Sequence, residues 1–506
     1  MRKTTILTIL DGWGIGKKDQ NNPIYSQDLK TLKYIESHYP SGALQASGIA
    51  VGLPWEERGS SEISHLILGA GRTIYQPYPK ISLSIKDGSF FKNEKIQKSI
   101  QHVKQNNSVL NIVGLLSYAN NESSLFHLNA LITLAKNENI PFNLHLFLDG
   151  QDSPPQSALD LIEQLPKENI TSLSGRYYSM DEDEKWDRIE KCYKVLTGQI
   201  PNLIDPRQHL LNSYQRNITD NQINPTLTGP TLRPIKDNDA VIFFNFREDS
   251  SWEIVAPFIN SSLTNIKSIK LNNVLISTFT RYRYEFKTEV LFENEIVKNT
   301  LSQTLSIHNK TQLKISETLR YAQITYYLNG GQEAPFKNEY RVIIPSQNTP
   351  KPEQYPALRA EEITGRLLGS IHENVFDLLI VNYPNADIIG HTGHLKSAES
   401  AVKIIDQELS KIYKASTESN STLIIIGSHG NIEDMVDPLT GIPNPYNTKN
   451  PVPFYLVDNH LQKSGRPPLG EVTIGIISDI APTILELLEI PKPSDMTGVS
   501  LLPYLR

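Results

Sequence analysis

The sequence predicts an α/β protein with a mostly parallel sheet and a second α/β domain inserted into the first. At 506 residues, the chain is too long for one hydrophobic core, so at least two domains are expected. Short apolar runs also end repeatedly in polar residues. This pattern is typical of buried parallel strands that deliver side chains to the carboxyl edge of a sheet, where ligands bind.

Three of these runs lie near the two ends of the chain and predict strands of one sheet. They are Thr5–Leu10, before Asp11; 376–381, before 382–387; and 423–426, before 427–431. Amphipathic patterns predict helices over 397–413 and 479–488. Because the first strand and the late strands share one pattern, we expect them to share one sheet.

The middle of the chain predicts an α/β domain of its own. Strands are expected at 109–113, 143–147, 240–244 and 273–277, with helices between them. Residues 201–235 are rich in Asn, Pro and Thr, which predicts a long loop. The expected division is residues 1–77 plus 311–506 for the first domain and 78–310 for the inserted one.

Composition excludes several classes of function. The net charge is −6, from 49 basic and 55 acidic side chains, so the overall charge does not attract the chain to nucleic acid or an anionic membrane. Cys192 is the only cysteine, which excludes an internal disulfide and a cysteine metal site. The first apolar run is broken by Asp11 and is too short for a signal peptide or a membrane span. We therefore expect a soluble, cytoplasmic protein.

Residues 59–72 contain the best candidate nucleophile, Ser61, followed four residues later by His65. A serine hydroxyl needs a base or a metal ion to react at neutral pH. No Gly-x-Ser-x-Gly elbow surrounds Ser61, which argues against a hydrolase triad. The Asp and His residues near the end of the chain make a metal the better candidate.

These segments together resemble the cofactor-independent (2,3-bisphosphoglycerate-independent) phosphoglycerate mutases of the alkaline phosphatase superfamily. The resemblance runs from Leu7 to Leu502. The matching segments, in order, are 10–14, Ser61-Glu62 with His65, 148–150, 174–178, 244–247, 327–331, 390–393, 429–431, 450–453 and 479–483. It implies an alkaline-phosphatase-like sheet domain with an inserted substrate (phosphotransferase) domain.

The resemblance also implies a reaction and a set of site residues. The family interconverts 2- and 3-phosphoglycerate, in glycolysis and gluconeogenesis, through a phosphoserine and two divalent ions, manganese or magnesium. In this chain Ser61 takes the place of the nucleophile. The implied metal ligands are Asp11, Ser61 and His429 for one ion, and Asp387 and His391 for the other. Asp387 and His391 are four residues apart, a helical spacing, although Pro384 and Gly390 favour a loop. The expected partner is a small phosphorylated substrate, and the family suggests a monomer.

Two metal positions depart from the family pattern. Ser428 stands where the family has an aspartate, and Asn447 where it has a histidine. The site thereby loses negative charge and imidazole basicity, so metal affinity is expected to fall, to one ion or none. Glu433 and His394 are the candidates to substitute for the lost ligands.

The expected substrate pocket departs further. Glu122 replaces the histidine that transfers protons, and neutral or acidic residues replace three arginines, at Gln151, Glu182 and Ser250. Arg320 replaces a lysine near the metals. The implied substrate-binding residues in this chain are Asp152, Arg176, Arg247, Arg320, Glu122 and Gln151. Three hypotheses remain: a mutase, a non-catalytic paralogue with a binding or regulatory role, and a phosphatase or phosphotransferase acting on a less anionic substrate.

Overall fold

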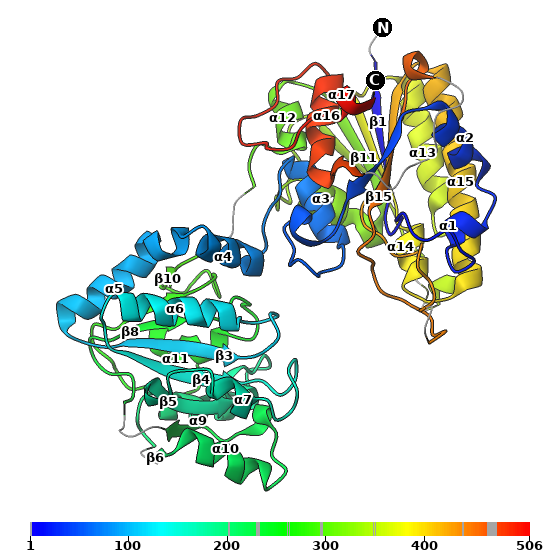
Figure 1. Ribbon diagram of the computed structural model, residues 1–506. Helices are drawn as coiled ribbons and strands as arrows, with labels where there is room; N and C mark the ends of the chain where they lie inside the picture. The colour runs from blue at the N-terminus through cyan, green and yellow to red at the C-terminus, as the bar shows by residue number, and fades with distance from the viewer. Residues whose placement is uncertain are drawn as a thin grey trace. The chain divides into compact units, whose positions relative to one another are not determined.

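The computed structural model describes residues 3–200, 203–228, 233–260, 262, 264–293, 297–347, 349, 351–437, 440–462 and 473–505. The chain divides into two compact units (Figure 1). The first unit is built from Met1–Gln76 and Glu295–Arg506, and the second, inserted unit is Pro77–Asn294. Each unit contains its own sheet, so the expected α/β class with an inserted α/β domain is confirmed.

The first unit is organised around an eight-stranded sheet. Its strand order is β12-β11-β13-β1-β14-β15-β2-β16. The bounds are β1 Thr5–Leu10, β2 Ser41–Gln45, β11 Gln312–Glu317, β12 Glu339–Ile344, β13 Leu378–Tyr383, β14 Thr422–Gly427, β15 Val452–Val457 and β16 Thr473–Ile476. The three strands expected from the sequence are β1, β13 and β14, and they are neighbours at the centre of this sheet.

The register of these three strands brings their carboxyl ends level with one another. β1 pairs in parallel with β13 on one side and β14 on the other, so that Leu10 lies opposite both Tyr383 and Gly427. All three strands are buried along their whole length, as expected for a parallel strand covered on both faces. The residues that follow the strands therefore meet at one edge.

Helices cover both faces of this sheet (Figure 1). Side chains of α3, α12 and α16 pack on one face, and those of α2, α13 and α15 pack on the other. The bounds are α1 Pro23–Ser26, α2 Lys30–His38, α3 Ser61–Ala70, α12 Leu301–Ile307, α13 Ala360–Glu373, α14 Asn385–Gly390, α15 Leu395–Glu418, α16 Ile480–Leu487 and α17 Leu502–Leu505. The two helices expected from the sequence correspond to α15 and α16.

The second unit contains another eight-stranded sheet, in the order β10-β9-β8-β3-β4-β5-β7-β6. Its pairs are parallel except for β5 with β7. The bounds are β3 Leu110–Leu116, β4 Phe142–Leu148, β5 Ile170–Gly175, β6 Leu203–Ile204, β7 Thr226–Thr228, β8 Ala240–Phe243, β9 Leu275–Thr278 and β10 Glu289–Val290. The four strands expected here are present as β3, β4, β8 and β9.

The helices of the second unit pack on both faces of its sheet. Their bounds are α4 Pro77–Lys86, α5 Glu94–Asn106, α6 Leu125–Asn137, α7 Ala158–Ile162, α8 Arg176–Ser179, α9 Trp186–Leu196, α10 Pro206–Tyr214 and α11 Trp252–Ile259. In the described part of the chain, no helix is long and apolar enough to cross a bilayer.

Two sequence expectations need correction. The long loop expected over 201–235 contains β6, α10 and β7 in its described part; residues 201–202 and 229–232 lie outside the described residues. A start signal for α10 was present, since Asp205 caps the helix and Pro206 is its first residue. The second domain boundary lies near residue 294, not at 310/311. Leu301 and Leu305 of α12 explain the difference, because they pack in the first unit's core.

Candidate active site

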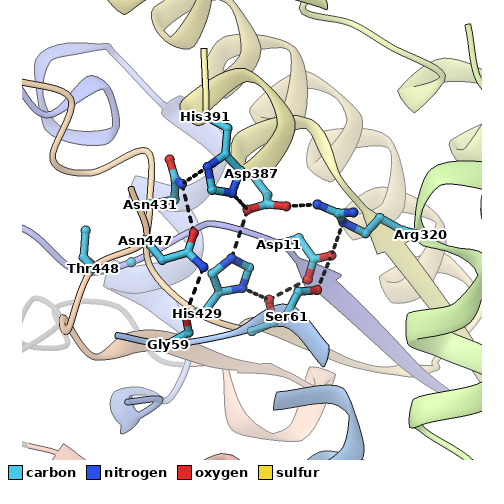
Figure 2. A network of polar contacts seen from close by, with 12 residues as sticks. Asp11, Gly59, Ser61, Arg320, Asp387, His391, His429, Asn431, Asn447 and Thr448 are labelled. Carbon is cyan, nitrogen blue, oxygen red and sulfur yellow. Dashed lines mark hydrogen bonds and ion pairs between the residues drawn. The ribbon is translucent and has the colours of Figure 1, made fainter. Parts of the chain in front are cut away.

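The carboxyl edge of the first unit's sheet gathers the polar residues expected from the sequence (Figure 2). Asp11 directly follows β1, Asp387 lies in α14 after β13, and Ser428 and His429 directly follow β14. Ser61 is the first residue of α3. Asp11 and His429 are fully buried and Asp387 is 1% exposed. Five residues from four separate parts of the sequence thus meet in one buried polar cluster.

Ser61 faces Asp11 across the start of α3. Its hydroxyl donates a hydrogen bond to Asp11 Oδ2 at 3.1 Å. His65 lies one helical turn away, but its Nδ1 contacts the Ser61 carbonyl oxygen at 2.8 Å, not the hydroxyl. Burial lowers the pKa of His65. The geometry therefore pairs the candidate nucleophile with a carboxylate, and His65 supports the backbone beneath it.

Asp387 is the centre of a second set of contacts. Its Oδ1 lies 3.0 Å from His429 Nε2 and 3.2 Å from His391 Nε2. The expectation of a loop here is wrong, because residues 385–390 form α14 and His391 caps its end. Pro384 lies directly before this helix, where its missing N–H group costs no helical hydrogen bond. The helix places His391 and Asp387 on one face, as their spacing of four allows.

Electrostatics link these groups. Burial alone would raise the pKa of Asp387, but His429, His391 and Arg320 together hold it well below its usual value. Conversely, burial would lower the pKa of His429, whereas Asp387 and Asp11 raise it. The hydrogen bond that His391 donates to Asp387 also raises the pKa of His391. The cluster thus favours the ionised form of Asp387 and the protonated forms of His391 and His429.

Arg320 supplies a further positive charge to the same cluster. It ends a short 3-10 turn, Thr318–Arg320, directly after β11. Its guanidinium forms an ion pair with Asp387, and its Nε lies 3.4 Å from Asp11 Oδ2. One cation thus contacts both carboxylates (Figure 2). Among the described residues, no three or more His, Cys, Asp or Glu side chains already have the geometry of a metal-binding site.

The remaining positions near the cluster have other partners. Ser428 donates to Asp11 Oδ1 at 2.5 Å. Asn447 donates to the Gly59 carbonyl oxygen at 2.9 Å and accepts from Asn431 at 3.0 Å. Glu433, one of the two possible substitutes, accepts from the backbone N–H of Asn431 at 2.8 Å and from Thr448. His394, the other, caps α15. Both therefore have local structural partners.

The second unit brings three of the implied substrate-binding residues, Arg176, Asp152 and Glu122, into one network of contacts. Arg176 Nη1 lies 2.8 Å from Asp149 Oδ1 and 2.9 Å from Asp152 Oδ2. Its Nη2 lies 3.9 Å from Glu122 Oε1. Arg176 follows β5, and Asp149 follows the neighbouring β4, so the sheet edge sets their approach. One arginine thus faces three carboxylates.

Arg247 approaches the same glutamate from the other side. Its Nη1 lies 3.4 Å from Glu122 Oε1, and its Nε and Nη2 contact Asp249 at 3.0 and 2.8 Å. Ser250 donates to Glu122 Oε2 at 2.5 Å. Burial raises the pKa of Glu122, against the opposing effect of Ser250 and both arginines.

Two of the altered positions lie outside this network. The side chains of Gln151 and Glu182 are exposed, although the Gln151 backbone N–H donates to Asp149 at 3.2 Å. Sequence reasoning missed Asp149 and Asp249 as partners of the arginines. Asp249 carried a usable signal, because it lies two residues after Arg247. Asp149 was noted only as part of a matching segment, and its contact with Arg176 depends on the pairing of β4 with β5.

Comparisons with known proteins agree with this architecture. A family model described as the BPG-independent PGAM N-terminus matches residues 81–284. A 2,3-bisphosphoglycerate-independent phosphoglycerate mutase of Clostridium botulinum is 38% identical and is aligned over 99% of both chains. A Methanosarcina barkeri protein called 2,3-bisphosphoglycerate-independent phosphoglycerate mutase 1 is also 38% identical, over 99% of this chain and 98% of its own.

A solved structure extends the agreement to the fold. The phosphoglycerate mutase of Leishmania mexicana matches with a TM-score of 0.57 and 23% identity, over 99% of this chain and 97% of that one. At this identity the match supports the fold alone. The full-length sequence relatives carry the stronger conclusion: this chain belongs to the family of 2,3-bisphosphoglycerate-independent phosphoglycerate mutases.

Proposed function

We propose that the chain is a phosphotransferase of the phosphoglycerate mutase type, with Ser61 as the residue that takes the phosphoryl group. The observation that carries this proposal is the position of the Ser61 hydroxyl, 3.1 Å from a buried Asp11. Ser61 is also the first residue of α3. A helix N-terminus favours a bound phosphate through its free N–H groups and its dipole. Arg320 adds positive charge at the same place.

In the proposed step, Ser61 Oγ attacks phosphorus, and the bond between phosphorus and the substrate oxygen breaks. The proton that the Ser61 hydroxyl gives up goes to its hydrogen-bond acceptor, Asp11. The departing substrate oxygen takes that proton from Asp11 and becomes a hydroxyl. Return of the phosphoryl group to the neighbouring hydroxyl of the same molecule reverses each change and regenerates Ser61. The net reaction is an isomerisation.

The donor chemistry of the cluster fits a divalent ion, and we propose manganese or magnesium. Carboxylate oxygen, a serine hydroxyl and imidazole nitrogen are suitable ligands, and Asp11, Ser61, Asp387, His391 and His429 would hold the metal. When bound, an ion supplies a lowered serine pKa and charge neutralisation on the transferring group. Because Arg320 contacts both carboxylates, an ion has to share or displace that contact.

The residues to which we assign substrate binding lie in the second unit, apart from Arg320. We propose substrate-binding roles for Arg176, Arg247, Asp152, Glu122 and Gln151. A small phosphorylated substrate, a monomeric state and a cytoplasmic location belong to the same proposal.

The test is conversion of 3-phosphoglycerate by the purified protein with manganese, beside Ser61→Ala. We expect measurable turnover for the wild type and background for the variant, because removing a nucleophile removes the covalent route. Equal, background-level turnover of both proteins would favour the non-catalytic paralogue. The matched control is Glu163→Gln, which alters an exposed residue of the second unit. It should leave turnover unchanged.

A further inference from the structure

A cavity of about 490 Å³ lies within the first unit, between α1, α2, β15 and the segment 13–20 that follows β1. Its lining, as far as the structure describes it, includes none of the polar residues gathered around Ser61. Pockets that bind small organic molecules typically measure about 300–1,000 Å³. The cavity is therefore large enough for a ligand of its own.

The inner wall of this cavity is apolar and aromatic. Trp13 and Tyr455 line it and are 1% and 5% exposed. Leu29 and Leu32 line it as well, and all four side chains belong to one hydrophobic core cluster. Such a wall favours an aromatic ring in the ligand, because ring packing adds to the gain from removing apolar area from water.

Two polar atoms in this wall have no partner. Among the described residues, neither the Tyr455 hydroxyl nor the Trp13 indole N–H forms a hydrogen bond, although both side chains are more than nine-tenths buried. Buried tyrosine and tryptophan usually find such a partner. Burial raises the pKa of Tyr455, so its hydroxyl keeps its proton and remains a donor. The wall thus offers two hydrogen bonds to a ligand.

Positive charge lies at the opening of the cavity. Lys18 and Lys33 are exposed residues of its lining. Lys33 forms an exposed ion pair with Asp28 at 2.8 Å, whereas Lys18 forms none within the described part of the chain. Glu36 is the carboxylate of the described lining. Two lysines and one glutamate leave a surplus of one positive charge, which complements a ligand with one negative charge.

We propose that this cavity is a second ligand site, for a monoanionic aromatic molecule whose ring carries a hydrogen-bonding group. The ring packs against Leu29 and Leu32. Its polar substituent accepts hydrogen bonds from Tyr455 and Trp13, and its carboxylate lies at the opening beside Lys18. The site belongs to the first unit alone and takes no part in the reaction at Ser61, so the inference goes beyond the proposed function.

Three probes that differ by one group test the proposal. 3-(4-Hydroxyphenyl)propionate has both the ring hydroxyl and the carboxylate, 3-phenylpropionate lacks the hydroxyl, and 3-(4-hydroxyphenyl)propionamide lacks the charge. Each is titrated calorimetrically into the full-length protein in a metal-free buffer. We expect the first probe to bind about fivefold more tightly than 3-phenylpropionate, which corresponds to one net hydrogen bond. It should bind about threefold more tightly than the amide, because an ion pair with an exposed lysine is weak.

Two variants assign these preferences to the cavity. Tyr455→Phe should reduce the preference for the ring hydroxyl to about twofold or less, since only the Trp13 N–H remains. Its fold should be unaffected, because the hydroxyl that it removes has no partner. Lys18→Met should abolish most of the preference for the acid over the amide. The matched controls are Tyr340→Phe and Lys403→Met, exposed residues on β12 and α15 of the same unit, and they should keep both preferences.

The proposal is overturned if none of the three probes binds, if all three bind equally, or if Tyr455→Phe or Lys18→Met keeps the preference of the wild type that it should lose. Equal losses in a variant and its matched control would also overturn it. These results are independent of phosphoryl transfer, because binding is measured without substrate or metal.

Discussion

Replacing Arg320 with methionine tests the electrostatic structure of the Ser61 cluster. The guanidinium contacts Asp11 and Asp387, which are 0% and 1% exposed. Arg320→Met keeps most of the side-chain length but leaves a buried negative charge without its partner. Removing one member of a buried ion pair typically costs about 3–5 kcal/mol. We expect about 3 kcal/mol here, because His429 and His391 still contact Asp387.

Hydrogen exchange of β1 is the suitable measurement, since this strand ends directly before Asp11 and reports on the first unit alone. In a metal-free buffer, 3 kcal/mol corresponds to roughly 100-fold faster exchange of the peptide that contains Thr5–Leu10. Excess manganese should reverse most of the loss in the variant, because a ligand at about 100 times its Kd contributes about 2.7 kcal/mol. The wild type should respond less, because its arginine already neutralises the site.

The matched control is Arg366→Met, which removes an exposed arginine from α13 of the same unit. It should change neither the exchange of β1 nor its response to manganese. The reasoning is refuted if Arg320→Met exchanges like the wild type without metal, or if manganese protects both proteins equally.

Two further predictions concern the stability of each unit. Burial raises the pKa of Glu253 from 4.5 to about 7. Between these two pKa values the folded protein keeps a proton on Glu253 that the unfolded chain has already released. The free energy of unfolding therefore falls as pH rises through this range. Urea unfolding at pH 5 and 7.5 should show this fall in the wild type and a smaller one in Glu253→Gln; equal falls would contradict it. In α3, a Cβ added at Gly69 would lie 1.9 Å from the Leu328 carbonyl oxygen, so Gly69→Ala should destabilise the first unit by about 1–3 kcal/mol. Gly365→Ala, on α13 with open space around it, should instead stabilise the first unit by about 0.5–1 kcal/mol. Hydrogen exchange of β1 should therefore be faster in Gly69→Ala and slower in Gly365→Ala than in the wild type. Equal effects of the two substitutions would refute the packing argument.

The central strands were predictable because burial on both faces leaves a clear mark in the sequence. Thr5–Leu10 is apolar apart from its two threonines and is followed by Asp11, so the strand and the polar residue after it follow from the pattern, whereas the role of Asp11 was implied by the resemblance. The α10 segment was hidden by its Asn- and Pro-rich neighbours, although its cap, Asp205, was visible. The helical state of α14 depends on its packing against α15, a contact between elements that no local pattern reveals.

The site was predictable in its members but not in its contacts. The family resemblance named Asp11, Ser61, Asp387, His391 and His429, and the structure brings them together. That Arg320 contacts both aspartates depends on where β11 ends relative to β1 and β13. Likewise, the contact of Glu122 with both arginines requires three loops of the second sheet to meet, and this arrangement comes from tertiary packing.

Trapping the phosphorylated protein tests the central proposal most directly. The protein is mixed with a phosphate monoester substrate and manganese, quenched in acid within milliseconds to seconds, digested and analysed by mass spectrometry. The account predicts a phosphoryl group on the peptide of residues 59–72 at Ser61, absent from Ser61→Ala. Turnover of the same substrate with an unmodified Ser61 at every quench time, or with the label on another residue, would contradict it.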